Sequence, residues 1–187
     1  MRTDFDTRAR PLPSWLAPLT LWMNRGTPDA RARLRAFAER AHVLSPLAWQ
    51  RTRWRIERAC VLEAIAHVPT GDEWGVRAAG ERVVMALDHA ILSGALAEEL
   101  PLRGATSARS ARIGMPQAPG APLTADYSAA EAVEWGGATG FPAEAAWWAT
   151  QASVEEESAQ ESAARLAAEI LGILEDECKS AEARVSG

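Results

Sequence analysis

Between Asp72 and Leu100, small and apolar residues recur at alternating spacings of four and three positions. This spacing places them along one face of an α-helix. The residues of this row are Val76, Gly80, Val83, Leu87, Ala90 and Gly94. A glycine inside a helix costs about 1 kcal/mol relative to alanine, so the two glycines indicate that another helix packs closely against the row. The pattern predicts a helix that presents a close-packing face and ends at Pro101.

Two earlier helices begin at a hydroxyl residue followed by proline. In such a pair the hydroxyl caps the helix and the proline fits its first turn. Thr27-Pro28 predicts one helix start and Ser45-Pro46 predicts the next. Thr70 and Glu73 have the spacing of a capping box and predict the start of the helix described above. Together these segments form a predicted three-helix half, residues 27–100.

The composition of the chain changes at Pro101. Residues 101–125 contain four prolines and three glycines, and they show no hydrophobic periodicity. Segments of this length without structure of their own are either functional loops or disordered. The sequence therefore predicts one long irregular loop over these residues.

The remaining residues, 126–187, are predicted to form an acidic helical half. Ser128 and Glu131 form a possible capping box for a short helix that breaks at Gly136-Gly137, and Pro142 opens the next helix. The pattern leaves open whether the chain beyond Pro142 forms one helix or two. Because no segment alternates with a period of two, we expect an all-α fold, a single-domain bundle of five to six helices.

Residues 1–26 form a predicted N-terminal arm that contains Trp15 and Trp22. These tryptophans either dock on the domain itself or contact another chain. The chain has a net charge of −5, but the charge is unevenly spread, with +7 over residues 1–58 and −10 over residues 126–187. Either the basic and acidic regions pack on each other, or one of them attracts a charged partner.

The N-terminal residues, the lengths of the apolar runs and the cysteine spacing indicate the cellular location of the protein. Asp4 and Asp6 stand where a signal peptide would be positively charged, and no apolar run approaches the ~18 residues that a membrane span requires. Cys60 and Cys178 lack disulfide-framework or metal-ligand spacing. Abundant alanine and arginine, with one lysine, indicate a GC-rich bacterial genome. We therefore expect a cytoplasmic bacterial protein that does not bind membranes.

One group of residues has the chemistry of a metal site. Glu63 and His67 share a face of one predicted helix with Cys60, and Asp88 and His89 lie in the middle of the next helix. Carboxylates and histidines from facing helices bind metals in bundle cores, but such sites repeat a Glu-x-x-His motif on two helices. Glu63 and His67 are four positions apart and the motif does not repeat. We expect no metal, no other cofactor and no catalytic activity.

The sequence favours a protein that binds another protein or a second copy of itself. An acidic helical chain of this size fits an immunity, antitoxin or adaptor protein with a basic partner. Adjacent helical residues point about 100° apart, so Trp147 and Trp148 cannot both face one narrow core. The predicted contact residues are Trp15, Trp22, Trp147, Trp148, Glu155, Glu156 and Glu157.

Two alternative functions remain open. A pocket between helices would indicate a small-molecule-binding protein or an enzyme, and its predicted lining is Trp54, His67, Trp74 and His89. Nucleic-acid binding would use arginines for phosphates and tryptophans for bases, and the residues available are Trp49, Arg51, Arg53, Trp54, Arg55 and Arg58. The acidic net charge and the lack of a known DNA-binding motif argue against nucleic acid.

Overall fold

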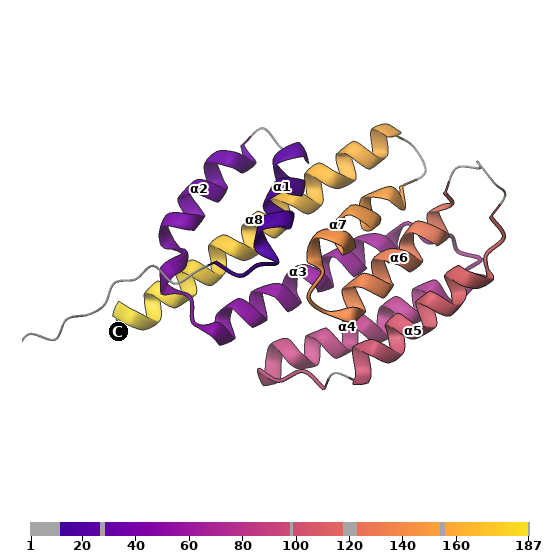
Figure 1. The fold of residues 1–187 in the computed structure, drawn as a ribbon, viewed down its shortest axis with the longest axis horizontal. Coiled ribbons are helices and arrows are strands. Elements are labelled where there is room, and N and C mark those ends of the chain that lie inside the picture. The colour runs from indigo at the N-terminus through magenta and orange to yellow at the C-terminus, as the bar shows by residue number, and fades with distance from the viewer. Residues whose placement is uncertain (1–11, 27–28, 98, 118–122, 154–155, 187) are drawn as a thin grey trace, which may run out of the picture.

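The computed structural model describes residues 12–26, 29–97, 99–117, 123–153 and 156–186 (Figure 1). Within these ranges the chain forms helices and no strand, which confirms the all-α class. The prediction of five to six helices is wrong, because the described residues form eight. Their bounds are α1 Leu16–Gly26, α2 Ala30–Arg40, α3 Pro46–Ala66, α4 Val76–Ser93, α5 Glu99–Gly114, α6 Ala125–Ala138, α7 Pro142–Gln151 and α8 Glu156–Ser186, with a 3₁₀ turn at Ala41–Val43.

The central helix is α3, which packs against α4, α6, α7 and α8. It starts at the predicted Ser45-Pro46 pair, where the Ser45 hydroxyl accepts a hydrogen bond of 3.1 Å from the backbone N–H of Ala48. Figure 1 shows α4 and α5 on one side of α3, with α2 and α8 on the other. Because α3 has neighbours on several sides, large residues such as Trp54 and Ile56 are fully buried.

Glycines bring α4, α5 and α6 into close contact with their neighbours. Gly80 of α4 faces the side chain of Ile65 so closely that a methyl group there would overlap it. A methyl group at Gly104 of α5 would lie 2.9 Å from the backbone oxygen of Ala79. One at Gly137 of α6 would lie 2.8 Å from the backbone oxygen of Pro101. The close helix crossing predicted at Gly80 is present, and similar crossings extend to α5 and α6.

The predicted end of the third helix at Pro101 is wrong. The helix α4 ends at Gly94, whose φ of 73° is the left-handed conformation typical of a glycine that closes a helix. Gly94 is therefore a C-cap, and an added methyl group there would lie 3.1 Å from Nη2 of Arg51 on α3. Pro101 lies in the first turn of α5, where its missing N–H has no intrahelical partner to lose.

The long loop predicted over residues 101–125 is consequently wrong for residues 101–114, which belong to α5. This helix buries small residues, among them Gly104, Ala105 and Ala108, against α4 and α6. Small buried residues give weak hydrophobic periodicity, which is why the segment resembles a loop in the sequence. Of the rest of the predicted loop, residues 118–122 lie outside the described residues.

Two predicted capping boxes are also wrong. The helix α4 is capped by Asp72, whose carboxylate accepts hydrogen bonds from the backbone N–H groups of Val76 (2.8 Å) and Arg77 (3.1 Å), and not by Thr70 with Glu73. The helix α6 begins before Ser128, because the Thr124 hydroxyl accepts the backbone N–H of Tyr127 at 3.2 Å.

The predicted break at Gly136-Gly137 is wrong too, since both glycines lie inside α6. The next predicted start is present, because Pro142 occupies the first turn of α7. The chain beyond Pro142 forms two helices, with α7 ending at Gln151 and α8 beginning at Glu156.

The N-terminal arm forms a helix that docks on the bundle. In α1, Leu16, Leu19 and Met23 are buried, and the helix contacts α2, α7 and α8. Pro18 lies in its first turn, where a proline is tolerated. The predicted helix start at Thr27-Pro28 lies outside the described residues. Among the helices of the described ranges, none is long and apolar enough to cross a membrane.

Candidate functional site

The helix α7 is built from alanines on its inner face and two tryptophans on its outer face. Ala145, Ala146 and Ala149 are buried, so α7 packs closely on α3 and α6. The Trp147 side chain is 44% exposed. Trp148 is half-buried and packs edge-to-face on Tyr127, with ring centroids 6.1 Å apart. The two tryptophans therefore differ in exposure, and they do not both face the core.

The two tryptophans of α7 meet apolar residues of α1 at the surface. Trp147 and Trp148 contact each other edge-to-face, with ring centroids 4.6 Å apart. Leu21 of α1 is 60% exposed beside them. Together the two helices line a hollow of about 260 Å³, which we call the α1–α7 pocket; its lining residues are Pro18, Leu21, Trp22, Ala143, Glu144, Trp147 and Trp148.

The structure thus brings together three of the predicted contact residues, Trp22, Trp147 and Trp148. The predicted contact residue Trp15 lies at a different hollow, which contains Trp49. Glu155 lies outside the described residues, and the side chains of Glu156 and Glu157 are not described, although α8 begins at Glu156. Leu21 and Pro18 were not predicted as contact residues, since only the docking of α1 on α7 places them there.

The turn that positions α7 is held by a buried carboxyl group. Glu57 of α3 is fully buried, and its Oε1 accepts a hydrogen bond of 2.5 Å from the backbone N–H of Gly140. Burial raises the pKa of Glu57 to about 7, although the Gly140 bond and the charge of Arg53 act in the opposite direction. Thr139 and Gly140 have φ values of 50° and 110°, so this turn uses left-handed backbone. Glu57 therefore fixes the point from which α7 starts.

Most carboxylates in the C-terminal part of α8 are paired with arginines of α2 and α3. Three such ion pairs are present, Arg33 with Glu175 (2.8 Å), Arg40 with Glu182 (2.7 Å) and Arg55 with Glu177 (2.9 Å). The hydrogen bond from Arg33 lowers the pKa of Glu175. The basic and acidic ends of the chain thus pack on each other, which was one of the two sequence interpretations.

The acidic residues near α7 have different surroundings. From Pro142 to Glu161 the chain contains no lysine or arginine. Its acidic residues are Glu144, Glu155, Glu156, Glu157 and Glu161. Glu144 and Glu161 are exposed. Glu144 lines the α1–α7 pocket, so the described lining of the pocket includes a carboxylate.

The candidate metal ligands on α3 and α4 do not come together. His67 bonds to Oε1 of Glu63 at 3.1 Å, and the same oxygen accepts hydrogen bonds from Ser162 and Arg165 of α8. Burial raises the pKa of Glu63, but these hydrogen bonds outweigh burial and lower it. Asp88 pairs with Arg58 at 2.5 Å. These contacts join α3 to α8 and to α4.

The two remaining candidate ligands, Cys60 and His89, do not join these contacts. Cys60 is buried, and its burial raises the pKa of the thiol. His89 is exposed on α4. Over the described ranges, no group of three or more histidine, cysteine, aspartate or glutamate side chains is arranged to hold a metal ion. Ser162 was missed by the sequence analysis, since only the contact of α8 with α3 places it beside Glu63.

The two alternative sites also depend on residues that the structure separates. Trp54 is fully buried in α3, so it is not accessible for stacking on a base, whereas Trp74 is 37% exposed before α4. His67 bonds to Glu63 and His89 is exposed, so the four predicted pocket residues face different surroundings. In the arginine row of α3, Arg55 and Arg58 already pair with carboxylates.

Comparison with known proteins does not assign a function to these pockets and contacts. The chain matches no known family model, no curated protein and no solved structure.

Proposed function

We propose that this protein binds another protein through the α1–α7 pocket. The observation that carries the proposal is that Trp22, Trp147 and Trp148, from two separate helices, line one exposed hollow. Tryptophan is enriched among the residues that dominate binding energy at protein interfaces. The hollow has a volume of about 260 Å³, below the range of about 300–1,000 Å³ that is usual for small-molecule pockets. It fits an apolar side chain that projects from a partner.

The charge around this pocket favours a basic partner. Glu144 lines the pocket, and the neighbouring chain to Glu161 carries acidic residues without a basic one. Charge of one sign at an interface raises the association rate of an oppositely charged protein. By contrast, Glu175 and Glu177 of α8 are engaged with arginines of this chain. The acidic contribution to binding is therefore expected from residues 144–161 and not from the whole C-terminal third.

The proposal is tested by comparing two tryptophan variants. The protein is purified with its partner from the native host, and the dissociation constant of the pair is then measured for the wild type and for Trp147→Ala. Loss of an aromatic residue at an interface centre typically costs about 2 kcal/mol or more, so the expected weakening is about 30-fold. Trp74→Ala is the matched control, because Trp74 is a similarly exposed tryptophan that does not line this pocket.

Equal affinities for the wild type and Trp147→Ala, with weakening by Trp74→Ala, would contradict the proposal. Recovery of the wild-type chain without any bound protein, from cells that express it at its normal level, would also count against it. Thermal unfolding of each variant checks that the fold is retained.

A further inference from the structure

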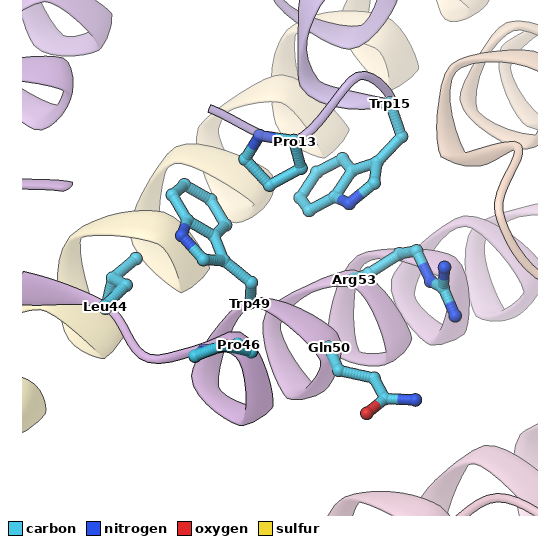
Figure 2. Close-up of a pocket in the computed structure, with 7 residues that line it drawn as sticks. All are labelled: Pro13, Trp15, Leu44, Pro46, Trp49, Gln50 and Arg53. Carbon is cyan, nitrogen blue, oxygen red and sulfur yellow. The ribbon is translucent and has the colours of Figure 1, made fainter. Parts of the chain in front are cut away.

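A second hollow lies between the start of the described chain and the start of α3. It has a volume of about 510 Å³, within the usual range for small-molecule pockets. We call it the Trp15–Trp49 pocket; its lining residues are Pro13, Trp15, Leu44, Pro46, Trp49, Gln50 and Arg53. Figure 2 shows the two indole rings above the start of α3, with the side chains of Gln50 and Arg53 extending from the helix in other directions.

The aromatic walls of this pocket are held in place by other rings. Trp15 and Trp49 contact edge-to-face, with centroids 5.9 Å apart and planes at 76°. On its other side, Trp49 contacts the buried Phe37 edge-to-face, with centroids 5.8 Å apart. Because Trp49 is fixed between two rings, it loses little freedom when a ligand binds. Such preorganisation reduces the entropic cost of binding.

The charged group of this pocket is Arg53, which has unused hydrogen-bonding capacity. Its Nε is buried, like that of Arg51, and so does not face the pocket. The Arg53 side chain as a whole is 23% exposed and lines the pocket. The nearest carboxylate oxygen, Oε1 of Glu57, lies 3.7 Å away and already accepts the backbone N–H of Gly140. By contrast, Arg55 and Arg58 of the same helix bond directly to carboxylates at 2.9 Å and 2.5 Å. The Arg53 guanidinium is thus available to an anionic group.

We propose that the Trp15–Trp49 pocket binds a small planar aromatic molecule that carries a carboxylate or another anionic group, with the ring against the two indoles and the anion at Arg53. Aromatic rings pack on indole faces and edges with a gain beyond simple burial. An arginine offers several N–H donors in a fork that matches a carboxylate. Gln50 lines the same pocket and provides an amide for a further polar group of the ligand.

The burial of Glu57 supports this assignment of charge. Burial raises the pKa of Glu57 to about 7, so the carboxyl is partly protonated near neutral pH. A protonated Glu57 does not cancel the positive charge of Arg53. In the molecules with a protonated Glu57, the charge of Arg53 has no carboxylate to compensate it at this ion pair.

The test measures binding of two probes by titration calorimetry. 2-Naphthoate has an aromatic ring system and a carboxylate, and 2-naphthamide has the same shape without the charge. We expect 2-naphthoate to bind the wild type with a dissociation constant on the order of 100 µM, and 2-naphthamide to bind at least about tenfold more weakly.

Two arginine variants assign that difference to the pocket. Arg53→Gln is expected to raise the dissociation constant of 2-naphthoate about tenfold and to leave that of 2-naphthamide unchanged. Arg51→Gln removes the same charge from the same helix at a residue that does not line the pocket, and it is expected to have no effect. Thermal unfolding confirms that both variants fold.

Three outcomes would overturn the proposal. One is the absence of 2-naphthoate binding at about 1 mM, and another is equal binding of the two probes to the wild type. The third is equal weakening by Arg53→Gln and Arg51→Gln, which would indicate a general charge effect. Binding of a proline-rich peptide without binding of 2-naphthoate would assign the pocket to peptide recognition instead.

Discussion

The two sides of α3 are built in opposite ways. On the side of α4, α5 and α6, which we call the glycine-packed side, glycines allow backbones to approach so closely that an added methyl group would collide with neighbouring atoms. On the tryptophan-lined side, which comprises residues 13–26, the start of α3 and α7, large rings leave two surface hollows. Dense packing leaves little room for a ligand, whereas rings that cannot fully interdigitate leave accessible apolar surface. A further hollow, of about 240 Å³, lies where α4 meets α3 and α8, and charged residues such as Arg58 and Asp88 line it.

This difference indicates a division of roles. We propose that the glycine-packed side supplies stability and that the tryptophan-lined side supplies binding surface. The two hollows of the second side differ in charge, since Arg53 lines one and Glu144 lines the other. Substitutions on the glycine-packed side should consequently lower the free energy of unfolding, and surface substitutions on the tryptophan-lined side should lower the affinity for a partner.

The largest effect on stability is expected from Gly137→Leu. A side chain at Gly137 would lie 2.8 Å from the Pro101 backbone oxygen and 2.9 Å from the Ala105 methyl group, so α5 and α6 would have to move apart. We expect a loss of about 3 kcal/mol or more in the free energy of unfolding, measured by urea denaturation. Gly172→Leu in α8 is the matched control, because nothing lies within 4 Å of its added Cβ. A similar loss in both variants would show that the glycine-packed side is not specially crowded.

A smaller effect, which depends on pH, is expected from Glu57→Gln. The ordinary pKa of 4.5 is raised to about 7 in the folded protein. The folded state therefore retains a proton that the unfolded state has lost, and the stability contributed by Glu57 is present below pH 4.5 and is lost as the pH rises through about 7. Between pH 5 and pH 8 this amounts to about 2 to 3 kcal/mol.

Glutamine keeps an acceptor for the N–H of Gly140 but does not ionise. The free energy of unfolding, obtained from urea denaturation at each pH in this interval, should accordingly fall less steeply with pH for Glu57→Gln than for the wild type. If the two proteins show the same pH dependence, Glu57 is not the buried titrating group, and the turn before α7 is held in another way.

The smallest stability effects are expected from the acidic residues. Glu177→Gln breaks a partly buried pair with Arg55 and should cost up to about 1 kcal/mol, with a smaller loss at high salt. Glu144→Gln should change stability by less than about 0.5 kcal/mol, since Glu144 is exposed.

The acidic residues near α7, which are expected to contribute little to stability, should have the larger effect on binding. Replacing Glu155, Glu156 and Glu157 together with lysine is expected to slow association with a basic partner, most strongly at low salt. Glu81→Lys on α4 is the control, because α4 does not contact α7. Stopped-flow association rates measure both, and equal slowing by the two variants would mean that the acidic residues near α7 have no special role.

Local signals in the sequence were sufficient where one residue pair determines a boundary. Ser45-Pro46 and Pro142 marked helix starts correctly, because a capping hydroxyl or a proline in the first turn acts within a few residues. Proline and glycine were ambiguous elsewhere. Pro101 can end one helix or begin the next, and Gly94 fits both a packing face and a helix C-cap.

Features that depend on tertiary contact could not be predicted. Gly136 and Gly137 have the composition of a helix break, and only the contacts with α3 and α5 show that they allow close packing. Glu57 stands in an arginine-rich stretch that looks solvent-exposed, until the Gly140 bond shows it to be buried. The exposure of one of the Trp147-Trp148 pair was predictable from helix geometry, but the meeting of that pair with Trp22 was not.

The most direct test of the division of roles is photo-crosslinking in the native host. A photoreactive amino acid is placed at position 147 on α7 or at position 92 on α4, where Leu92 is 84% exposed. Light should produce a covalent adduct of one defined mass from position 147, which identifies the partner, and none from position 92. An adduct from position 92 without one from position 147 would contradict the account, because it would place the interface on the glycine-packed side.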